Sequence, residues 1–304
     1  MTTIQNVAVA GGTGNLGSYI VQALVAANFN VTVLTRPTSN STNKLPTIRY
    51  QQTDYSPSSL SSVLQGQDAL VCSLGVFGTL DQTHLIDACL NNGISRIVLS
   101  EFGNAPHQAR LPELDFARTS KKAVLDYAIQ KSSENPEFSW SALATGNFID
   151  WAISRFPAEM GFCFPERKAR IYDNGEERIT GTCIRRIAEA VVGILKRPEE
   201  TKNRFLRVRS LEASQNEILG AFEEVMGAKW TVEYVNSKEV LERAKEKLAK
   251  GDKGAVLDLV SVQLWQEGMG RSIVVSREEA DNELLGIPED DLRTVVKGIL
   301  EDKF

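Results

Sequence analysis

The sequence predicts an α/β protein with a doubly wound parallel sheet, because strand-length apolar runs alternate with segments that can form helices. Strands joined through helices form right-handed crossovers, which leave the strands parallel. The length of 304 residues exceeds a typical domain of roughly 100–200 residues, which favours one large domain and one smaller domain. The strand-like runs are Ile4–Ala10, Asn30–Leu34, Ala69–Ser73 and Arg96–Ser100, and the helical segments include Asn15–Ala27 and Gln82–Asn92.

The alternation continues through the middle of the chain. A helix around Lys121–Ser132 precedes a strand at Phe138–Ala144, after which glycine, proline and aromatic residues interrupt the pattern. The segments Ile184–Leu195 and Arg204–Val208 again have a helix and a strand pattern, which predicts a return to the first domain. From Gln215 onward we expect mostly helices.

The composition excludes several classes of protein. A net charge of −5 without a basic stripe gives no reason to expect a nucleic-acid partner. Two histidines and four widely spaced cysteines without a CxxC pair indicate neither a metal site nor a disulfide framework. No apolar run reaches the roughly 18 residues of a membrane span, and the first run leaves no room for a signal peptide. We therefore expect a cytoplasmic protein that binds no membrane, nucleic acid or metal.

A glycine-rich turn follows the first strand and opens a helix. Its sequence GGTGNLG places glycines with GxxGxxG spacing where a strand must turn tightly and where backbone N–H groups must approach a pyrophosphate. A plain glycine turn is the alternative, and the position between strand and helix favours a dinucleotide-binding Rossmann loop. The predicted cofactor contacts in this loop are Gly11, Thr13, Gly14, Asn15, Leu16 and Gly17.

The residue after the second strand predicts which dinucleotide binds. NAD sites usually present Asp or Glu there, whereas this chain has Arg36, whose guanidinium can pair with a 2′-phosphate. We therefore predict NADPH rather than NADH, with an ordinary surface arginine as the alternative. Lys44 is a weaker candidate for a second phosphate contact. Asp54 and Gly75 are further candidates for cofactor contact, and each fits a plain turn residue equally well.

Two candidate acid-base residues lie on the predicted helix around Lys121–Ser132. Tyr127 and Lys131 match the YxxxK pattern of ordinary short-chain dehydrogenases. At about 100° per residue, however, Lys121 lies near the middle of the apolar stripe and Tyr127 roughly 130° from it. Desolvation there would lower the pKa of Lys121, unless its stem packs and its ammonium reaches water. The stripe consists of Val124, Leu125, Ala128 and Ile129.

Together these motifs resemble a known family. GGTGNLG, Leu34–Pro37, Ser100–Gly103 and a Lys-x-x-Val-x-x-Tyr helix that begins at Lys121 are similar to motifs of the isoflavone-reductase-like and NmrA-like atypical short-chain dehydrogenases/reductases. The stretch Asn135–Trp151 is similar to fungal members. The resemblance is dense over the first half of the chain and architectural afterwards.

The resemblance implies an NADPH-dependent reductase with a Rossmann domain and a smaller C-terminal substrate domain. Lys121 would be the catalytic general acid or base and would also lie against the cofactor. We place the Rossmann domain at residues 1–152 and 183–212 and the substrate side at residues 153–182 and 213–304. Further cofactor contacts implied by the resemblance are Ser100, Thr145, Gly146, Asn147 and Phe148.

The expected reaction is reduction of a polarised C=C, C=O or C=N bond in a small aromatic molecule of secondary metabolism. Two alternatives are a sensor that binds NADP(H) without turnover and an enzyme of non-redox cyclisation or rearrangement. Lys121 favours an enzyme, because a sensor needs no buried lysine. Monomer and homodimer both stay open. Aromatic residues that could contact the substrate, or equally fill the core, are Phe102, Phe148, Trp151 and Trp265.

Overall fold

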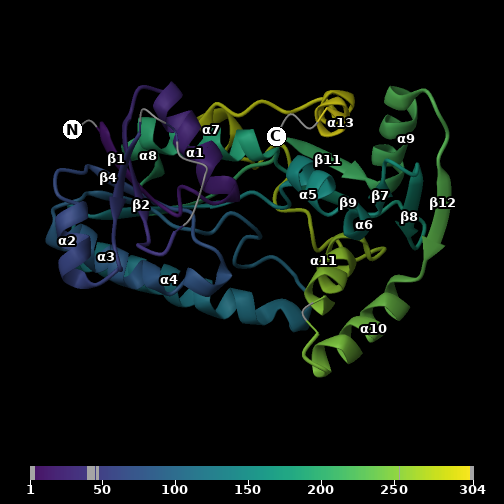
Figure 1. The fold of residues 1–304 in the computed structure, drawn as a ribbon, viewed down its shortest axis with the longest axis horizontal. Coiled ribbons are helices and arrows are strands. Elements are labelled where there is room, and N and C mark those ends of the chain that lie inside the picture. Colours follow the sequence, from purple (N-terminus) through teal and green to yellow (C-terminus); the bar gives the residue numbers. More distant parts are fainter. Residues whose placement is uncertain (1–3, 40–44, 46–47, 253, 302–304) are drawn as a thin grey trace.

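A seven-stranded parallel sheet forms one half of the molecule in the computed structural model, which describes residues 4–39, 45, 48–252 and 254–301 (Figure 1). The strand order β10-β6-β5-β4-β1-β2-β3 reverses direction between β1 and β4. This order confirms the predicted doubly wound α/β fold. The strands are β1 (Asn6–Ala10), β2 (Asn30–Thr35), β3 (Arg49–Gln52), β4 (Ala69–Cys72), β5 (Arg96–Val98), β6 (Ser139–Ala144) and β10 (Arg204–Arg207).

Helices cover both faces of this sheet and thereby bury its central strands on both sides. Alternate residues of β1 point to opposite faces: Val7 and Val9 pack with α1 and α7, whereas Ala8 and Ala10 pack with α2, α3 and α4. Figure 1 shows α2, α3 and α4 below the sheet and α1 and α7 above it. The helices are α1 (Asn15–Ala26), α2 (Pro57–Val63), α3 (Asp81–Asn91), α4 (Asp115–Glu134), α7 (Ile184–Lys196) and α8 (Pro198–Thr201).

Helix α4 differs from its prediction at both its start and its apolar face. It begins at Asp115, so Lys121 lies in the second turn and not at the start. Val124 and Ala128 are buried as predicted, but Ile129 is 45% exposed and does not belong to the buried stripe. The polar sequence of the first turn, with the exposed Phe116, carries no helical periodicity from which the true start could be predicted.

The C-terminal part is built around a second apolar core. The segment from Gln215 is mostly helical as predicted, and its strand β12 pairs with β8 at the edge of a small sheet. The half-exposed residues of β12 lack a clear apolar alternation. The elements are α5 (Ile149–Arg155), α6 (Pro157–Met160), β7 (Phe162–Cys163), β8 (Lys168–Tyr172), β9 (Arg178–Gly181), β11 (Leu211–Ser214), α9 (Gln215–Met226), β12 (Thr231–Val235), α10 (Ser237–Ala249), α11 (Ala255–Trp265) and α13 (Leu292–Leu300).

The division into two domains at the stated boundaries stays a prediction, and the packing adds one feature that it lacks. Helix α12 (Asn282–Leu285) packs against α7, and Leu285 and Ile287 join the apolar core on that face of the large sheet. A segment within the predicted substrate side therefore returns to the large sheet before α13.

Within the described residues, no helix is long and apolar enough to cross a membrane. The same part of the chain contains no group of three or more His, Cys, Asp or Glu side chains arranged to hold a metal ion.

Asp150 connects α5 to the start of α7. Its side chain is buried, and its Oδ1 accepts hydrogen bonds from the backbone N–H of Trp151 at 2.7 Å and of Ile184 at 3.0 Å. Burial raises the pKa of this carboxyl to about 6, although both N–H donors lower it.

Replacing Asp150 with Asn is expected to flatten the dependence of folding stability on pH. Because the pKa rises from 3.8 to about 6 on folding, the folded state binds this proton more tightly. The resulting stabilisation is complete below pH 3.8 and is lost as the pH rises through about 6. Asp150→Asn should remove about 1–3 kcal/mol of this pH dependence while its amide oxygen keeps the cap. Urea unfolding between pH 4 and 7 checks this, and identical pH profiles for variant and wild type would contradict it.

Candidate active site

A cavity of about 360 Å³ lies at the carboxyl end of the sheet, where the strand order reverses between β1 and β4. Crevices at this position are the usual ligand sites of open α/β sheets. We call it the glycine-loop cavity. Its lining residues lie at or after the carboxyl ends of β1, β2, β3 and β4 and are Gly11, Thr13, Gly14, Leu34, Thr35, Arg36, Thr38, Ser39, Tyr55, Ser73, Leu74 and Gly75.

The three spaced glycines of the loop have different steric roles. Gly11 has a φ of +78°, and a Cβ there would lie 2.2 Å from the backbone oxygen of Ser73. A Cβ on Gly17 would lie 2.1 Å from the oxygen of Gly11, so both positions need glycine for the turn itself. A Cβ on Gly14 would meet the oxygen of Gly11 at 3.2 Å and otherwise open space. A side chain at position 14 would therefore extend into the cavity.

Helix α1 begins at this loop with unsatisfied N–H groups. Its N-cap is Gly14, without a side-chain cap, and no acidic residue lies in the first turn. Among the described residues, the backbone N–H groups of Asn15, Leu16 and Gly17 have no acceptor. Free donors at the positive end of a helix dipole form an anion site, which fits a pyrophosphate. The side chain of Leu16 is buried, so only its backbone is available to a ligand.

Arg36 gives the glycine-loop cavity its charge. Its side chain is exposed, and within the described part of the chain its guanidinium forms no hydrogen bond or ion pair. None of the other lining residues is acidic or basic. A free guanidinium that follows β2 fits a phosphate group.

Two of the weaker cofactor candidates fall at different places, and the third, Lys44, lies outside the described residues. Gly75 lines the glycine-loop cavity. Asp54 does not, and its exposed carboxylate accepts a hydrogen bond from the N–H of Ser56 at 2.9 Å, just before α2, so its contact with the cofactor stays a prediction. The neighbouring Tyr55 lines the cavity, and its backbone has a φ of +64°, which no sequence pattern predicts for a tyrosine.

Ser100 is placed behind the cavity wall and not on it. Its hydroxyl accepts a hydrogen bond from the N–H of Leu74 at 2.9 Å and donates to the oxygen of Leu74 at 2.8 Å. The side chain is buried. Ser100 therefore positions the Ser73–Gly75 segment of the wall, and its direct contact with the cofactor stays a prediction.

The segment after β6 connects the large sheet to the C-terminal part. Thr145 is fully buried, and its carbonyl accepts a hydrogen bond from Thr182 Oγ1 at 2.6 Å. Gly146 has a φ of +64°, and a Cβ there would lie 2.7 Å from the oxygen of Thr180. Asn147 differs, because its Oδ1 is buried and has no hydrogen-bond partner within the described residues. A buried acceptor without a donor costs about 1–3 kcal/mol, so a ligand donor would be favourable there.

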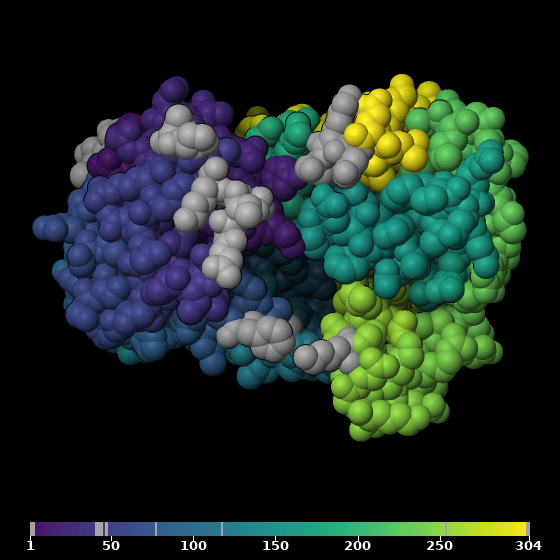
Figure 2. Space-filling model, in the orientation of Figure 1, coloured from purple at the N-terminus to yellow at the C-terminus, as the bar shows by residue number. Residues whose placement is uncertain are grey.

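A second cavity has a volume of about 390 Å³. Gly75 lines the glycine-loop cavity and the next residue, Val76, lines this one. Figure 2 shows the surface hollowed between the part that holds the large sheet and the green helices α10 and α11. We call this second cavity the lysine cavity. It is lined by Val76, Glu101, Asn104, Pro106, Arg110, Leu114, Phe116, Arg118, Lys121, Lys122, Leu125, Asp126, Val256, Val260 and Gln263.

Lys121 is partly buried on the wall of this cavity. Its Nζ donates a hydrogen bond to the backbone oxygen of Glu101 and lies 4.0 Å from Glu101 Oε2. Burial lowers the pKa of the Lys121 amine, the Glu101 carboxylate raises it, and the charge of Arg110 lowers it further, with a net shift downward. Burial also raises the pKa of Glu101. A lysine with a lowered pKa can give and take a proton closer to neutral pH.

Tyr127 lines neither of these cavities. Its hydroxyl donates a hydrogen bond to Asp87 Oδ1 on α3 at 2.6 Å, and the Nζ of Lys131 lies 5.3 Å from the centre of its ring. Burial and the bond to Asp87 raise the pKa of Tyr127 to about 12. The YxxxK pattern therefore packs α4 against α3 and does not face either cavity.

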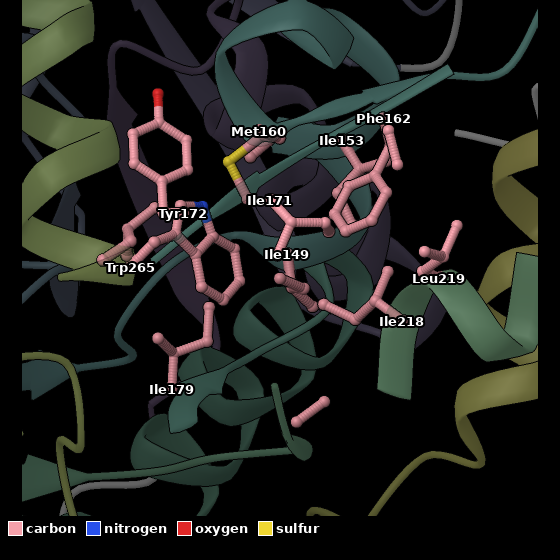
Figure 3. Packing of buried hydrophobic residues seen from close by; sticks show 14 of the residues in the cluster. Ile149, Ile153, Met160, Phe162, Ile171, Tyr172, Ile179, Ile218, Leu219 and Trp265 are labelled. Carbon is pink, nitrogen blue, oxygen red and sulfur yellow. The ribbon is translucent and has the colours of Figure 1, made fainter. Parts of the chain in front are cut away.

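The structure brings none of the four predicted aromatic residues to the described lining of either cavity, and their contact with a substrate stays a prediction. Trp265 is 1% exposed and lies in the second core, as Figure 3 shows. Phe102, Phe148 and Trp151 pack with the core on the α1 and α7 face of the large sheet. The apolar wall is mostly aliphatic and consists of Val76, Leu114, Phe116, Leu125, Val256 and Val260.

Three charged residues of the lysine cavity were missed from the sequence: Arg110, Arg118 and Asp126. Arg118 lies three residues before Lys121, so both are on one face of α4, and this spacing could have been recognised. Arg110 lies in an irregular segment before η2 (Pro112–Leu114), where no periodic pattern indicates its direction.

Comparison with known proteins identifies the family. The profile of the NmrA-like family matches residues 3–284. The chain belongs to the NmrA-like family. This NmrA-like chain is 38% identical to oxidoreductase poxI of Penicillium oxalicum over 295 residues, which are 96% of this chain and 93% of poxI. The predicted membership of an oxidoreductase family is thereby confirmed.

Solved structures share the fold of this NmrA-like protein. The NADPH complex of leucoanthocyanidin reductase from Vitis vinifera superposes with a TM-score of 0.79 at 20% identity, over 97% of this chain and 98% of that one. The structure of AtPrR2 with NADP⁺ and (+)-pinoresinol superposes with a TM-score of 0.79 at 21% identity, over 98% of this chain and 100% of that one. At this identity the superpositions establish the Rossmann-type fold.

Proposed function

We propose that this NmrA-like protein is an NADPH-dependent reductase of a small aromatic molecule, with Lys121 as the general acid. The observation that carries the proposal is that two consecutive residues, Gly75 and Val76, line the two cavities. One cavity has the glycine loop, free helix N–H groups and a free arginine, and the other has a lysine with a lowered pKa. The NADPH and NADP⁺ complexes among proteins of the same fold support this assignment.

The residues of the glycine-loop cavity fit the cofactor by their chemistry. The N–H groups at the start of α1 would bind the pyrophosphate, and Arg36 would bind the 2′-phosphate. Asn147 Oδ1, which lacks a donor in the described structure, would accept a hydrogen bond from the cofactor or the substrate. When bound, NADPH supplies a hydride to a polarised C=C, C=O or C=N bond.

Lys121 completes such a reduction from the side of the lysine cavity. Its Nζ would donate a proton to the substrate atom that gains negative charge, and its lowered pKa makes that donation easier. The backbone oxygen and carboxylate of Glu101 hold the amine in place. The apolar residues around it exclude water from the reacting groups.

A screen for NADPH consumption tests this function. We expect consumption with at least one class among aromatic enones, ketones and imines, and none in the absence of an acceptor. NADPH binding without consumption across the whole screen would contradict a reductase and favour the sensor or the non-redox enzyme.

Replacing Arg36 with Ala is expected to reduce the preference for NADPH. The variant should bind NADPH more weakly by about 1.5–3 kcal/mol, because a charge-assisted contact to the 2′-phosphate is lost. Its affinity for NADH should stay the same. Calorimetric titration with both cofactors measures this, and Lys202→Ala, which removes an exposed lysine paired with Glu199, is the control. Equal losses for NADPH and NADH would contradict the role of Arg36.

A further inference from the structure

Two arginines on the wall of the lysine cavity have no hydrogen-bond or ion-pair partner among the described residues. Neither Arg110 nor Arg118 forms a hydrogen bond or an ion pair through its guanidinium within the described part of the chain. The Nε of Arg110 is buried and lacks an acceptor. The two positive charges are also close enough that Arg118, together with burial, lowers the pKa of Arg110. Unpaired N–H groups and adjacent like charges are both unfavourable, so an anion between them would stabilise the site.

The other charges of the cavity are already balanced. Lys122 forms an ion pair with Asp126 at 2.5 Å, and Lys121 lies 4.0 Å from the Glu101 carboxylate. Glu101 and Asp115 act on Arg110 electrostatically, but neither forms an ion pair with it. Two positive charges therefore remain without a counter-charge in direct contact.

The rest of the cavity is suited to an apolar molecule. The exposed surface of the cavity is mostly apolar, and η1 (Val76–Gly78), α4 and α11 contribute aliphatic side chains to it. The volume of about 390 Å³ falls in the range of roughly 300–1,000 Å³ that is typical of small-molecule sites. The arrangement fits a ligand with an apolar body and one anionic end.

We propose that the lysine cavity selects apolar carboxylic acids and that Arg110 and Arg118 bind the carboxylate. This inference rests on the proposed function for the place of the chemistry, because it assigns the substrate class of that same cavity. The planar guanidinium presents two parallel N–H donors that match the two oxygens of a carboxylate. Lys121, on the same helix face as Arg118, then lies beside the body of the bound acid. Arg110 and Arg118 are specificity-determining residues in this account.

Binding of matched acid and amide probes tests the proposal. The probes are benzoate, trans-cinnamate and indole-3-acetate, each paired with its neutral primary amide and titrated calorimetrically into the protein with and without NADP⁺. We expect at least one carboxylate to bind more than about 10-fold tighter than its amide, since charged hydrogen bonds are worth about 1.5–3 kcal/mol. Equal affinities within all three pairs, or no binding of any carboxylate, would overturn the proposal.

Variants assign the preference to the two arginines. Arg110→Gln and Arg118→Gln should each weaken carboxylate binding by about 10- to 100-fold and leave amide binding unchanged. Arg118→Lys should lose less, because it keeps the charge without the fork. Lys122→Gln is the matched control, since this lysine lines the same cavity but is paired with Asp126. Unchanged carboxylate affinity in both arginine variants, with folding verified by thermal unfolding, would overturn the assignment.

The same titrations separate this inference from the proposed function. NADP⁺ affinity is measured independently of the probes, and the arginine variants should keep it. Carboxylate selectivity in a protein that does not bind NADP⁺ would contradict the reductase but retain the carboxylate site. NADP⁺ binding without carboxylate selectivity would retain the cofactor site and exclude this substrate class.

Discussion

Replacing Lys121 with Met is expected to reduce turnover by about 10²–10⁴-fold, the usual contribution of a general acid or base. Met keeps an unbranched apolar side chain at this position of α4 but lacks the amine that donates a hydrogen bond to the backbone oxygen of Glu101. NADPH affinity should change little, because Lys121 lines the lysine cavity and not the glycine-loop cavity. The measurement is the single-turnover rate at saturating NADPH with a substrate found by the screen.

Tyr127→Phe is the matched control for Lys121. It removes the hydroxyl bonded to Asp87, away from both cavities, and should therefore cost little activity. An inactive Tyr127→Phe together with an active Lys121→Met would show that the YxxxK pair carries the chemistry. If both variants kept full activity, neither side chain would be the proton donor.

Replacing Gly14 with Val is expected to weaken NADPH binding by more than about 100-fold while the protein stays folded. The backbone at position 14 has a φ of −79°, which any L-residue can adopt, and a Cβ there meets little of the protein. The branched side chain would instead occupy the space in front of the free N–H groups of α1 and prevent several charge-assisted contacts. Calorimetry with NADPH measures the loss.

Gly17→Ala separates the effect on the fold from the effect on binding. Its Cβ would overlap the backbone oxygen of Gly11 at 2.1 Å, so the loop or the helix must shift. We expect a loss of about 3 kcal/mol in the free energy of unfolding, as for severe overpacking. A Gly14→Val variant that binds NADPH as the wild type does would contradict the position of the pyrophosphate.

Local requirements explain which parts of the account could be predicted from the sequence. The loop from Gly11 to Gly17 was predictable because a strand, a tight turn and a helix follow one another within a few residues. The position of Lys121 on α4 followed from helical periodicity even though the start of the helix did not. In both cases, neighbours in sequence are also neighbours in space.

The lining of the lysine cavity could not be predicted in the same way, because it joins residues distant in sequence. Arg110 meets α4 and α11 through an irregular segment, and Val256 and Val260 come from the far end of the chain. Aromatic residues such as Trp265 fill volume in the core, and the sequence alone cannot distinguish a core aromatic from one that faces a ligand. Asp54 and Tyr55 are consecutive in the chain, and the backbone geometry decides which of the two side chains lines the cavity.

We infer that the glycine-loop cavity and the lysine cavity together support hydride transfer to a substrate held beside Lys121. Transfer of deuterium tests it most directly: the protein is incubated with NADPH that carries deuterium at C4 of the nicotinamide, and the product of a screened acceptor is analysed by mass spectrometry. We expect deuterium in the product with one of the two C4 epimers of NADPH. With the Gly14→Val variant we expect no deuterated product. NADPH that binds but transfers no deuterium to any acceptor, or product formed without the label from either epimer, would contradict it.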